Sequence, residues 1–171
     1  MSFSVGVASR FMEKPTVKHF NAVKQIMRYL KGTLNFGLVY TQEKKPEELV
    51  GYTYSDSGGD IVGRRSTSGM AFYLNEGLIT WNSHKEKTVA LSSCEAEFMA
   101  ATAAAKQAFW LRNLLGQIAA TEPRAVILYV DNSSDIALMK NPVFHGRSKH
   151  IDVNFHFLTE CVERGQIVVK K

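Results

Sequence analysis

The sequence predicts an α/β fold in which helices flank a mixed sheet. Three strand-like segments, at 48–55, 68–74 and 78–83, follow one another through turn-rich connections. A long alanine-rich helical segment then leads to an apolar run at 125–131, of the kind found in strands buried on both faces. Hairpin-linked strands are antiparallel, whereas a strand reached through a crossover helix is parallel to its neighbour, so the sheet should contain both kinds of pairing.

An amphipathic helix over 13–33 is predicted ahead of the sheet. Pro15 stands where a first helical turn tolerates proline, and Gly32 stands where a C-cap is expected. Apolar residues recur at intervals of three and four and form one stripe, made of Val17, Phe20, Val23, Met27 and Leu30. A stripe this regular needs a surface to cover, so we expect the helix to pack on the sheet-containing body of the chain.

The later elements follow from local signals. "NEG" joins the second and third strands as a tight hairpin. Ser92 and Glu95 form the reciprocal capping pattern at the start of the long helix, which continues to about 119. After the run at 125–131 we expect a short helix at 133–140, a loop at 141–148, a helix at 150–164 and a strand at 166–170.

Composition excludes several classes of protein. Hydrophobic residues make up 45% of the 171 residues, which is enough for a core and excludes a disordered tail. Cys94 and Cys161 stand far apart without a CxxC motif, so we expect two buried thiols in a reducing compartment. No segment approaches the roughly 20 apolar residues of a membrane helix. We therefore expect an intracellular protein of the cytoplasm or nucleus, with no membrane partner.

Positive charge is concentrated at the start of the chain. The first 47 residues carry eight basic and three acidic residues, which accounts for the whole net charge of +5. Such a basic arm suits phosphate backbones, but a solvated helix face explains it as well. The charged loop around Pro46 marks a boundary, and we divide the chain into 1–47 and 48–171.

Three acids fall where α/β sheets collect their chemistry, at strand ends and helix starts. They are Asp56 after the first strand, Glu97 in the first turns of the long helix, and Asp131 at the tip of "AVILYVD". Each alone also suits a structural role in a turn, at a helix dipole or as a cap. Three clustered carboxylates repel unless a divalent cation neutralises them, so together they predict a site for Mg²⁺ or Mn²⁺.

Several segments resemble a known family: "SRFMEKPTVKHFNAVKQIMRYLKGT", "RRSTSG", "LSSCEAEFMA" and "VDNSSDIALMKNPVFHGRSKHIDVNFHF". They are similar to the end of a copia-type LTR-retrotransposon polyprotein, where the last part of the reverse transcriptase meets the ribonuclease H domain. The resemblance covers nearly the whole chain. It implies a ribonuclease H-like five-stranded sheet and, in an active member, cleavage of RNA within RNA:DNA hybrids by two Mg²⁺ ions.

The resemblance also assigns the acids. Glu97 matches the second glutamate of the family's "TEAEYMA", and Asp131 matches the aspartate of its strand-end motif. For the first acid two alignments stay open. A gapless match places Tyr54 on the catalytic position, whereas a slipped match to the general ribonuclease H pattern places Asp56 there.

The C-terminus departs from the family pattern. Family members continue past the "GQIVV" strand into a segment whose aspartate is the fourth acid and whose helix covers the sheet. We therefore expect no fourth ligand, no C-terminal covering helix, and a partly bare sheet face that invites a protein partner or self-association. A start Met before a mid-polyprotein segment indicates a stand-alone copy.

Two functions follow from these features. The first is a degenerate ribonuclease H-like module that is catalytically impaired and binds protein or nucleic acid. The alternative is an active Mg²⁺-dependent ribonuclease H that cleaves the RNA of RNA:DNA hybrids. Five side chains are candidates for contacts to the substrate, and an exposed or helix-capping role is the alternative for each: Arg64, Arg65, His145, Arg147 and Lys149. Trp81 and Trp110 are expected to pack in the core rather than to stack on nucleic acid.

Overall fold

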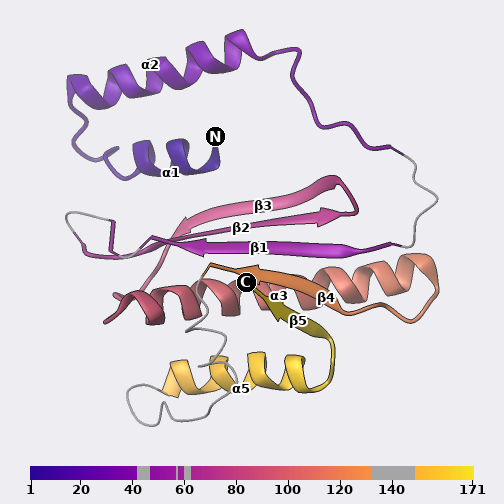
Figure 1. Cartoon of the computed structure of the whole chain (residues 1–171). Helices are drawn as coiled ribbons and strands as arrows, with labels where there is room; N and C mark the ends of the chain where they lie inside the picture. Colours follow the sequence, from indigo (N-terminus) through magenta and orange to yellow (C-terminus); the bar gives the residue numbers. More distant parts are fainter. Residues whose placement is uncertain (42–46, 57, 60–62, 132–148) are drawn as a thin grey trace.

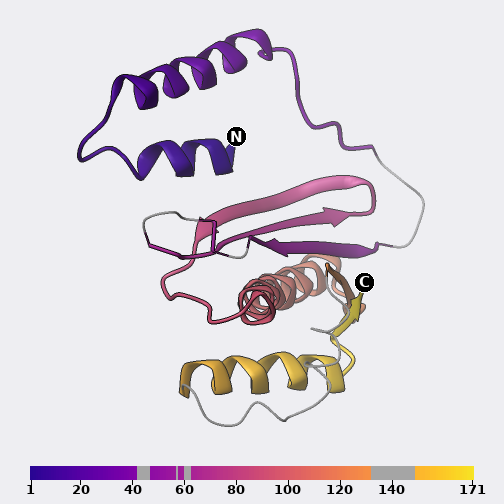
Figure 2. The same ribbon diagram turned by 60° about the vertical axis from the view of Figure 1, so that its left-hand side comes forward.

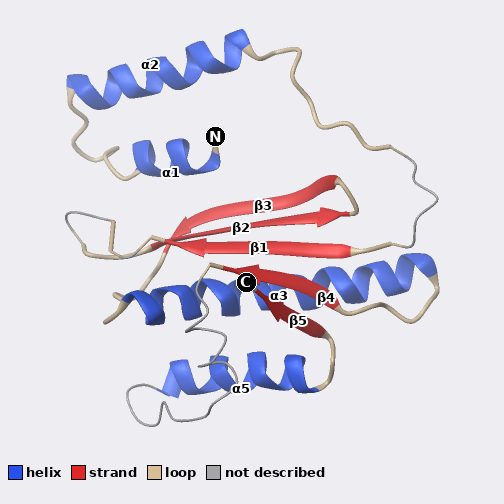
Figure 3. Ribbon diagram, in the orientation of Figure 1, coloured by secondary structure: helices blue, strands red, loops and turns tan. Residues whose placement is uncertain are grey.

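The structure is a computed structural model that describes residues 1–41, 47–56, 58–59, 63–131 and 149–171. Its strands are β1 (Leu49–Ser55), β2 (Thr67–Leu74), β3 (Gly77–Lys85), β4 (Val126–Val130) and β5 (Ile167–Lys170). Its helices are α1 (Ser2–Ser9), α2 (Val17–Gly32), α3 (Ser93–Ala119) and α5 (Lys149–Glu163). The strands form one sheet in the order β3-β2-β1-β4-β5 (Figures 1 and 3).

The pairing within this sheet is mixed, as predicted. β1 pairs antiparallel with β2, and β2 pairs antiparallel with β3. β4 runs parallel to β1, and β5 runs parallel to β4. The chain reaches β4 from β3 through α3, which is the crossover that a parallel strand requires. The helix predicted at 133–140 and the loop at 141–148 lie outside the described residues.

The core lies between the sheet and α3. The alanines of this helix let it approach the strands closely, and Ala104, Ala105 and Ala108 have no exposed surface. On the sheet side the fully buried Phe72 lies over Gly51, where a β-carbon would collide with the phenylalanine ring. α5 lies on the same side of the sheet as α3 (Figure 2). One face of the sheet therefore carries both helices of the core.

The first helix was not predicted from the sequence. α1 contacts β3, and Nη2 of Arg10 donates a hydrogen bond to Oγ1 of Thr67 at 3.1 Å. α2 packs on α1, and the rings of Phe11 and His19 stack with centroids 4.1 Å apart. α1 therefore lies between α2 and the sheet (Figures 1 and 2).

The apolar stripe of α2 remains exposed. Val17 is 76% exposed and Met27 is 62% exposed, and α2 contains no buried residue. The prediction that this stripe packs on the domain is wrong, because α1 occupies the place beside β3. The helix also begins later than predicted: Thr16 is its N-cap and forms a capping box with His19, so Pro15 precedes the helix.

Both cysteines are free thiols, as predicted. Cys161 is buried on α5, whereas Cys94 at the start of α3 is only half-buried. No helix in the described part of the chain is long and apolar enough to cross a bilayer.

Candidate functional site

The candidate site lies where β1 and β4 end side by side. Side chains alternate along β1, so Thr53 and Ser55 are buried on the face under α3, whereas Tyr52 and Tyr54 are exposed on the opposite face. We call that opposite face the open face; it carries Tyr52, Tyr54, Trp81 and Tyr129. The end of β1 therefore separates a buried side from an exposed one.

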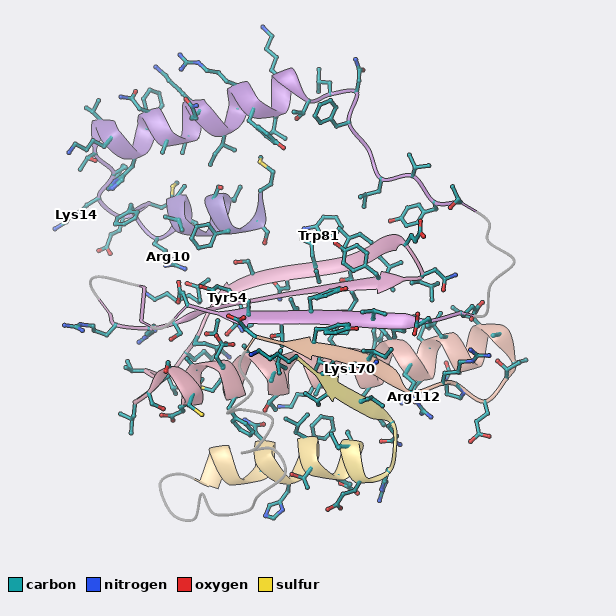
Figure 4. The ribbon with its side chains drawn as sticks, in the orientation of Figure 1. Arg10, Lys14, Tyr54, Trp81, Arg112 and Lys170 are labelled. Atoms are coloured by element: carbon teal, nitrogen blue, oxygen red, sulfur yellow. The ribbon has the colours of Figure 1, made fainter. Side chains whose placement is uncertain are left out.

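Tyr54 and Asp131 occupy matching positions at this end. Thr53 is paired with Val130 in the parallel ladder, and Tyr54 and Asp131 are the next residue on each chain segment. Neighbouring strands lie about 4.8 Å apart, so the two positions are adjacent. Tyr54 is 57% exposed at the tip of β1 (Figure 4), and Asp131 is exposed as well. In this register Tyr54, not Asp56, lies beside Asp131.

Glu97 reaches the same strand end from α3. Its Oε1 accepts a hydrogen bond from the backbone N–H of Ser55 at 3.3 Å. The helix start holds it there, because Oγ of Ser92 accepts from the N–H of Glu95 at 3.1 Å, as the capping pattern predicts. The Glu95 carboxylate accepts from the N–H of Leu91 at 2.6 Å, so it is used at the cap. Of the two glutamates, Glu97 is therefore the one that contacts the end of β1.

Asp56 has a structural role in the turn after β1. Its Oδ1 accepts a hydrogen bond from the N–H of Thr67 at 2.5 Å, and its own N–H donates to the carbonyl of Thr67 at 3.1 Å. Gly59 lies against the same carboxylate, and a β-carbon there would come within 2.5 Å of Oδ2. These contacts close the pairing of β1 with β2. The Asp56 carboxylate is therefore directed at β2.

The donors at this end fit a pair of divalent cations poorly. Among the residues that the structure describes, no group of three or more His, Cys, Asp or Glu side chains could hold a metal ion. Glu97 and Asp131 supply carboxylates, but the side chain beside Asp131 is the phenol of Tyr54. Two-ion sites for Mg²⁺ rely on anionic oxygens. We therefore derive no metal-dependent step from these residues.

A polar network beside Glu97 was missed from the sequence. Oε1 of Glu86 accepts a hydrogen bond from Oγ of Ser68 at 2.5 Å and lies 3.2 Å from Nε2 of His84. Ser68 is the cross-strand neighbour of both Ser55 and His84, so the three side chains form a row on the α3 side of the sheet. The charged "HKEK" before the helix is the signal that could have indicated it.

The predicted substrate residues are only partly described. Arg64 and Arg65 lie exposed in the connection between β1 and β2, just before β2 begins. They are therefore at the end of the sheet that holds Glu97 and Asp131. His145 and Arg147 lie outside the described residues, and Lys149 is the first residue of α5.

The prediction that both tryptophans pack in the core is wrong. Trp81 is 54% exposed on the open face of β3, and Trp110 is 57% exposed on α3. On the open face α1 packs on β3 but leaves Trp81 about half exposed, and on α3 the side chain of Trp110 remains outside the core. Hydrophobic content alone could not distinguish these positions from core positions.

Comparison with known sequences gives long matches to transposon polyproteins. The chain is 41% identical over 171 residues to the retrovirus-related Pol polyprotein from transposon TNT 1-94 of Nicotiana tabacum, covering 100% of this chain and 13% of that protein. It is 36% identical over 169 residues to the corresponding polyprotein from transposon RE1 of Arabidopsis thaliana, covering 99% of this chain and 12% of that protein. The chain thus spans about an eighth of the polyproteins that it matches.

A shorter relative is matched over most of its length. Secreted RxLR effector protein 161 of Plasmopara viticola is 45% identical over 111 residues, which cover 65% of this chain and 78% of that protein. No family model matches the sequence.

Solved structures share the fold. The foamy viral protease-reverse transcriptase in complex with dsDNA superposes with a TM-score of 0.55 at 14% identity, over 92% of this chain and 29% of that one. LC11-RNase H1, isolated from compost by a metagenomic approach, superposes with a TM-score of 0.50 at 14% identity, over 72% of this chain and 82% of that one. These likenesses show a ribonuclease H-like fold.

Proposed function

Because this chain belongs to the family of copia-type retrovirus-related Pol polyproteins and has their ribonuclease H-like fold, we propose that it binds RNA:DNA hybrids and cleaves them weakly or not at all. Binding and cleavage depend on different groups. Phosphates are held by cations and backbone N–H groups, whereas cleavage needs a complete set of anionic metal ligands. A chain that lacks one such ligand can therefore keep binding after it has lost cleavage.

The observation that carries the proposal is the pairing of Tyr54 with Asp131. The parallel register of β1 and β4 sets Tyr54 beside Asp131. The gapless match to the family aligns the same tyrosine with the first acid, and the two together support the proposal. A neutral phenol supplies less negative charge than a carboxylate and is a poorer ligand for a hard cation. Asp56, the other candidate for that role, has its carboxylate hydrogen-bonded to Thr67.

The binding surface that we propose lies around the end of β1. Arg64 and Arg65 are exposed there, and guanidinium groups bind phosphate oxygens in a bidentate manner. Recognition would follow the shape of the hybrid and its 2′-hydroxyls and would not depend on base identity. The foamy viral protease-reverse transcriptase, which shares this fold over 29% of its chain, is in complex with dsDNA, and this supports nucleic-acid binding as the proposal.

The alternative is an active enzyme that uses Mg²⁺ or Mn²⁺. It is favoured by one observation: Glu97 and Asp131 still stand at the ends of two adjacent strands. In that case Asp56 would complete the ligand set, while its Oδ1 also accepts the hydrogen bond from Thr67 that closes the turn.

A cleavage and binding experiment separates the two. The wild-type chain is incubated with a hybrid labelled on its RNA strand, in Mg²⁺ and then in Mn²⁺, and binding is measured by anisotropy in parallel. We expect binding without appreciable cleavage, and we expect Tyr54→Asp to restore cleavage. Tyr52→Asp is the matched control, because it adds the same charge on the same face of β1, two residues before Tyr54 and beside Tyr129 instead of Asp131, and should restore nothing.

The outcome that overturns the proposal is a wild-type chain that cuts the hybrid and loses this activity in Glu97→Gln. A wild-type chain that neither cuts nor binds would also overturn it. If Tyr54→Asp cuts, the double variant Tyr54→Asp/Glu97→Gln should be inactive, which excludes a contaminating nuclease.

A further inference from the structure

The open face of the sheet carries a row of aromatic side chains. The strand registers place Ala71 between Trp81 and Tyr52, and then place Tyr129 beside Tyr52 and Lys170 beside Tyr129. Trp81 is 54% exposed and Tyr52 is 48% exposed. Figure 4 shows Trp81 and Lys170 on the two strands at opposite edges of the sheet. We infer that this row is a stacking surface for unpaired bases of single-stranded nucleic acid.

The rings hold one another in place. Tyr52 stacks on Tyr129 with centroids 5.1 Å apart and an interplanar angle of 12°. The ring of Tyr73 meets Tyr52 edge-on at 5.8 Å and 88°. Rings fixed in this way lose little rotamer freedom when a ligand binds. The face is therefore organised before any base arrives.

α1 packs on β3 at this face, and beside it the centre of the row leaves Trp81 and Tyr52 about half exposed. Trp81 and Tyr52 are two strands apart, which corresponds to roughly 9.5 Å between their backbones. Ala71 between them has only a methyl group, so β2 does not fill the space above it. Beside Tyr52 the surface also has a hollow of about 440 Å³, lined by Val50, Tyr52, Tyr73, Asn75 and Glu76. Base–aromatic stacking is tolerant of sequence because every base has a π-face.

Charge favours a polyanion over a second copy of the chain. Lys85 and Lys170 stand at open-face positions of β3 and β5, and Arg10 reaches Thr67 at the same face. The described strand positions of this face carry no carboxylate; Glu48 before β1, Glu76 in the hairpin turn and Asp131 after β4 stand at its margins. A two-fold dimer would bring this patch against itself and set lysine against lysine. A phosphate backbone neutralises the same cations.

This surface is separate from the proposed hybrid site. The row crosses the middle of the open face at Tyr52, whereas the hybrid site lies at the end of β1, where Tyr54 stands two residues further on and Glu97 approaches from the α3 side. The inference therefore does not rest on hybrid binding, and the two can fail independently.

Tryptophan fluorescence tests the inference directly. The chain contains two tryptophans, so Trp110→Phe leaves Trp81 as the reporter. We expect a short oligothymidylate to quench this emission and, when labelled with fluorescein, to bind with an anisotropy change. Trp81→Ala should weaken binding about tenfold, which is the usual loss for one stacking ring. Lys170→Glu should weaken binding and reduce its dependence on salt.

The matched control is Trp110→Ala, because Trp110 is equally exposed but stands on α3. It should bind the oligonucleotide like the wild type, and Trp81→Ala should bind the RNA:DNA hybrid like the wild type. Unchanged oligonucleotide affinity in a folded Trp81→Ala chain overturns the inference. A wild-type dimer in sedimentation that becomes a monomer in Trp81→Ala also overturns the inference, because the face would then bind a second copy of the chain. If Trp81→Ala does not fold, the Lys170→Glu variant provides the test. Oligonucleotide affinity and salt dependence equal to those of the wild type would then overturn the inference.

Discussion

The side chain of Glu97 on α3 accepts a hydrogen bond from the backbone N–H of Ser55 at the end of β1, with 3.3 Å between the two atoms. This contact joins the first turns of the long helix to the strand that carries Tyr54. It explains why a glutamate from far along the chain lies at the strand end. It also makes Glu97 part of the fold as well as a candidate for chemistry.

Glu97→Ala should lower the free energy of unfolding by about 1 kcal/mol, because the N–H of the buried Ser55 loses its acceptor. Glu97→Gln keeps an oxygen at the same place and should cost less. Urea denaturation of both variants measures the difference. Equal losses in the two variants would mean that the hydrogen bond contributes nothing.

Gly51→Ala should destabilise the chain by about 1–3 kcal/mol, because the new methyl group overlaps the ring of Phe72 in a core without space. Gly69→Ala is the matched control, since the nearest atom to its β-carbon is 3.9 Å away. Thermal unfolding followed by circular dichroism compares them. A Gly51→Ala chain as stable as Gly69→Ala would show that Phe72 can move aside.

Ser92→Ala should destabilise the chain by about 0.5–2 kcal/mol, because the N–H of Glu95 loses its capping oxygen. Ser93→Ala, one residue inside the helix and exposed, should change stability little. Denaturant titrations give both values. If the two serines cost the same, the effect does not come from the cap.

The two thiols should react at different rates. Burial, followed by the charge of Glu160, raises the pKa of the Cys161 thiol. A raised pKa keeps the thiol protonated in the folded chain, so this group favours folding below its unfolded pKa, and that contribution is lost as the pH rises through the folded pKa. At mildly alkaline pH an aromatic disulfide reagent should label Cys94 first.

The single-thiol variant Cys94→Ser isolates the second reaction. Its remaining Cys161 should react slowly in buffer and quickly in urea. Rapid labelling of the folded Cys94→Ser chain would contradict the buried position on α5.

Local patterns in the sequence predicted the elements of the domain well. The capping pair Ser92 and Glu95 marked the start of α3, and the two-residue turn between Leu74 and Gly77 formed as the "NEG" hairpin. Both depend on residues that are neighbours in the chain. Exposure was predicted less well: Trp81 and the α2 stripe are apolar but uncovered, because covering depends on which other elements pack there.

The candidate site, too, was predictable only where it depends on residues that are neighbours in the chain. Alternation and capping, which are set by adjacent residues, were sufficient to predict that Glu97 and Asp131 belong at a helix start and a strand end. The residue beside Asp131 could not be chosen between Tyr54 and Asp56 from the chain alone. The pairing of Thr53 with Val130 sets Tyr54 next to Asp131, because strand register is set by packing between segments distant in sequence. Which of the two residues serves as the first acid stays a prediction.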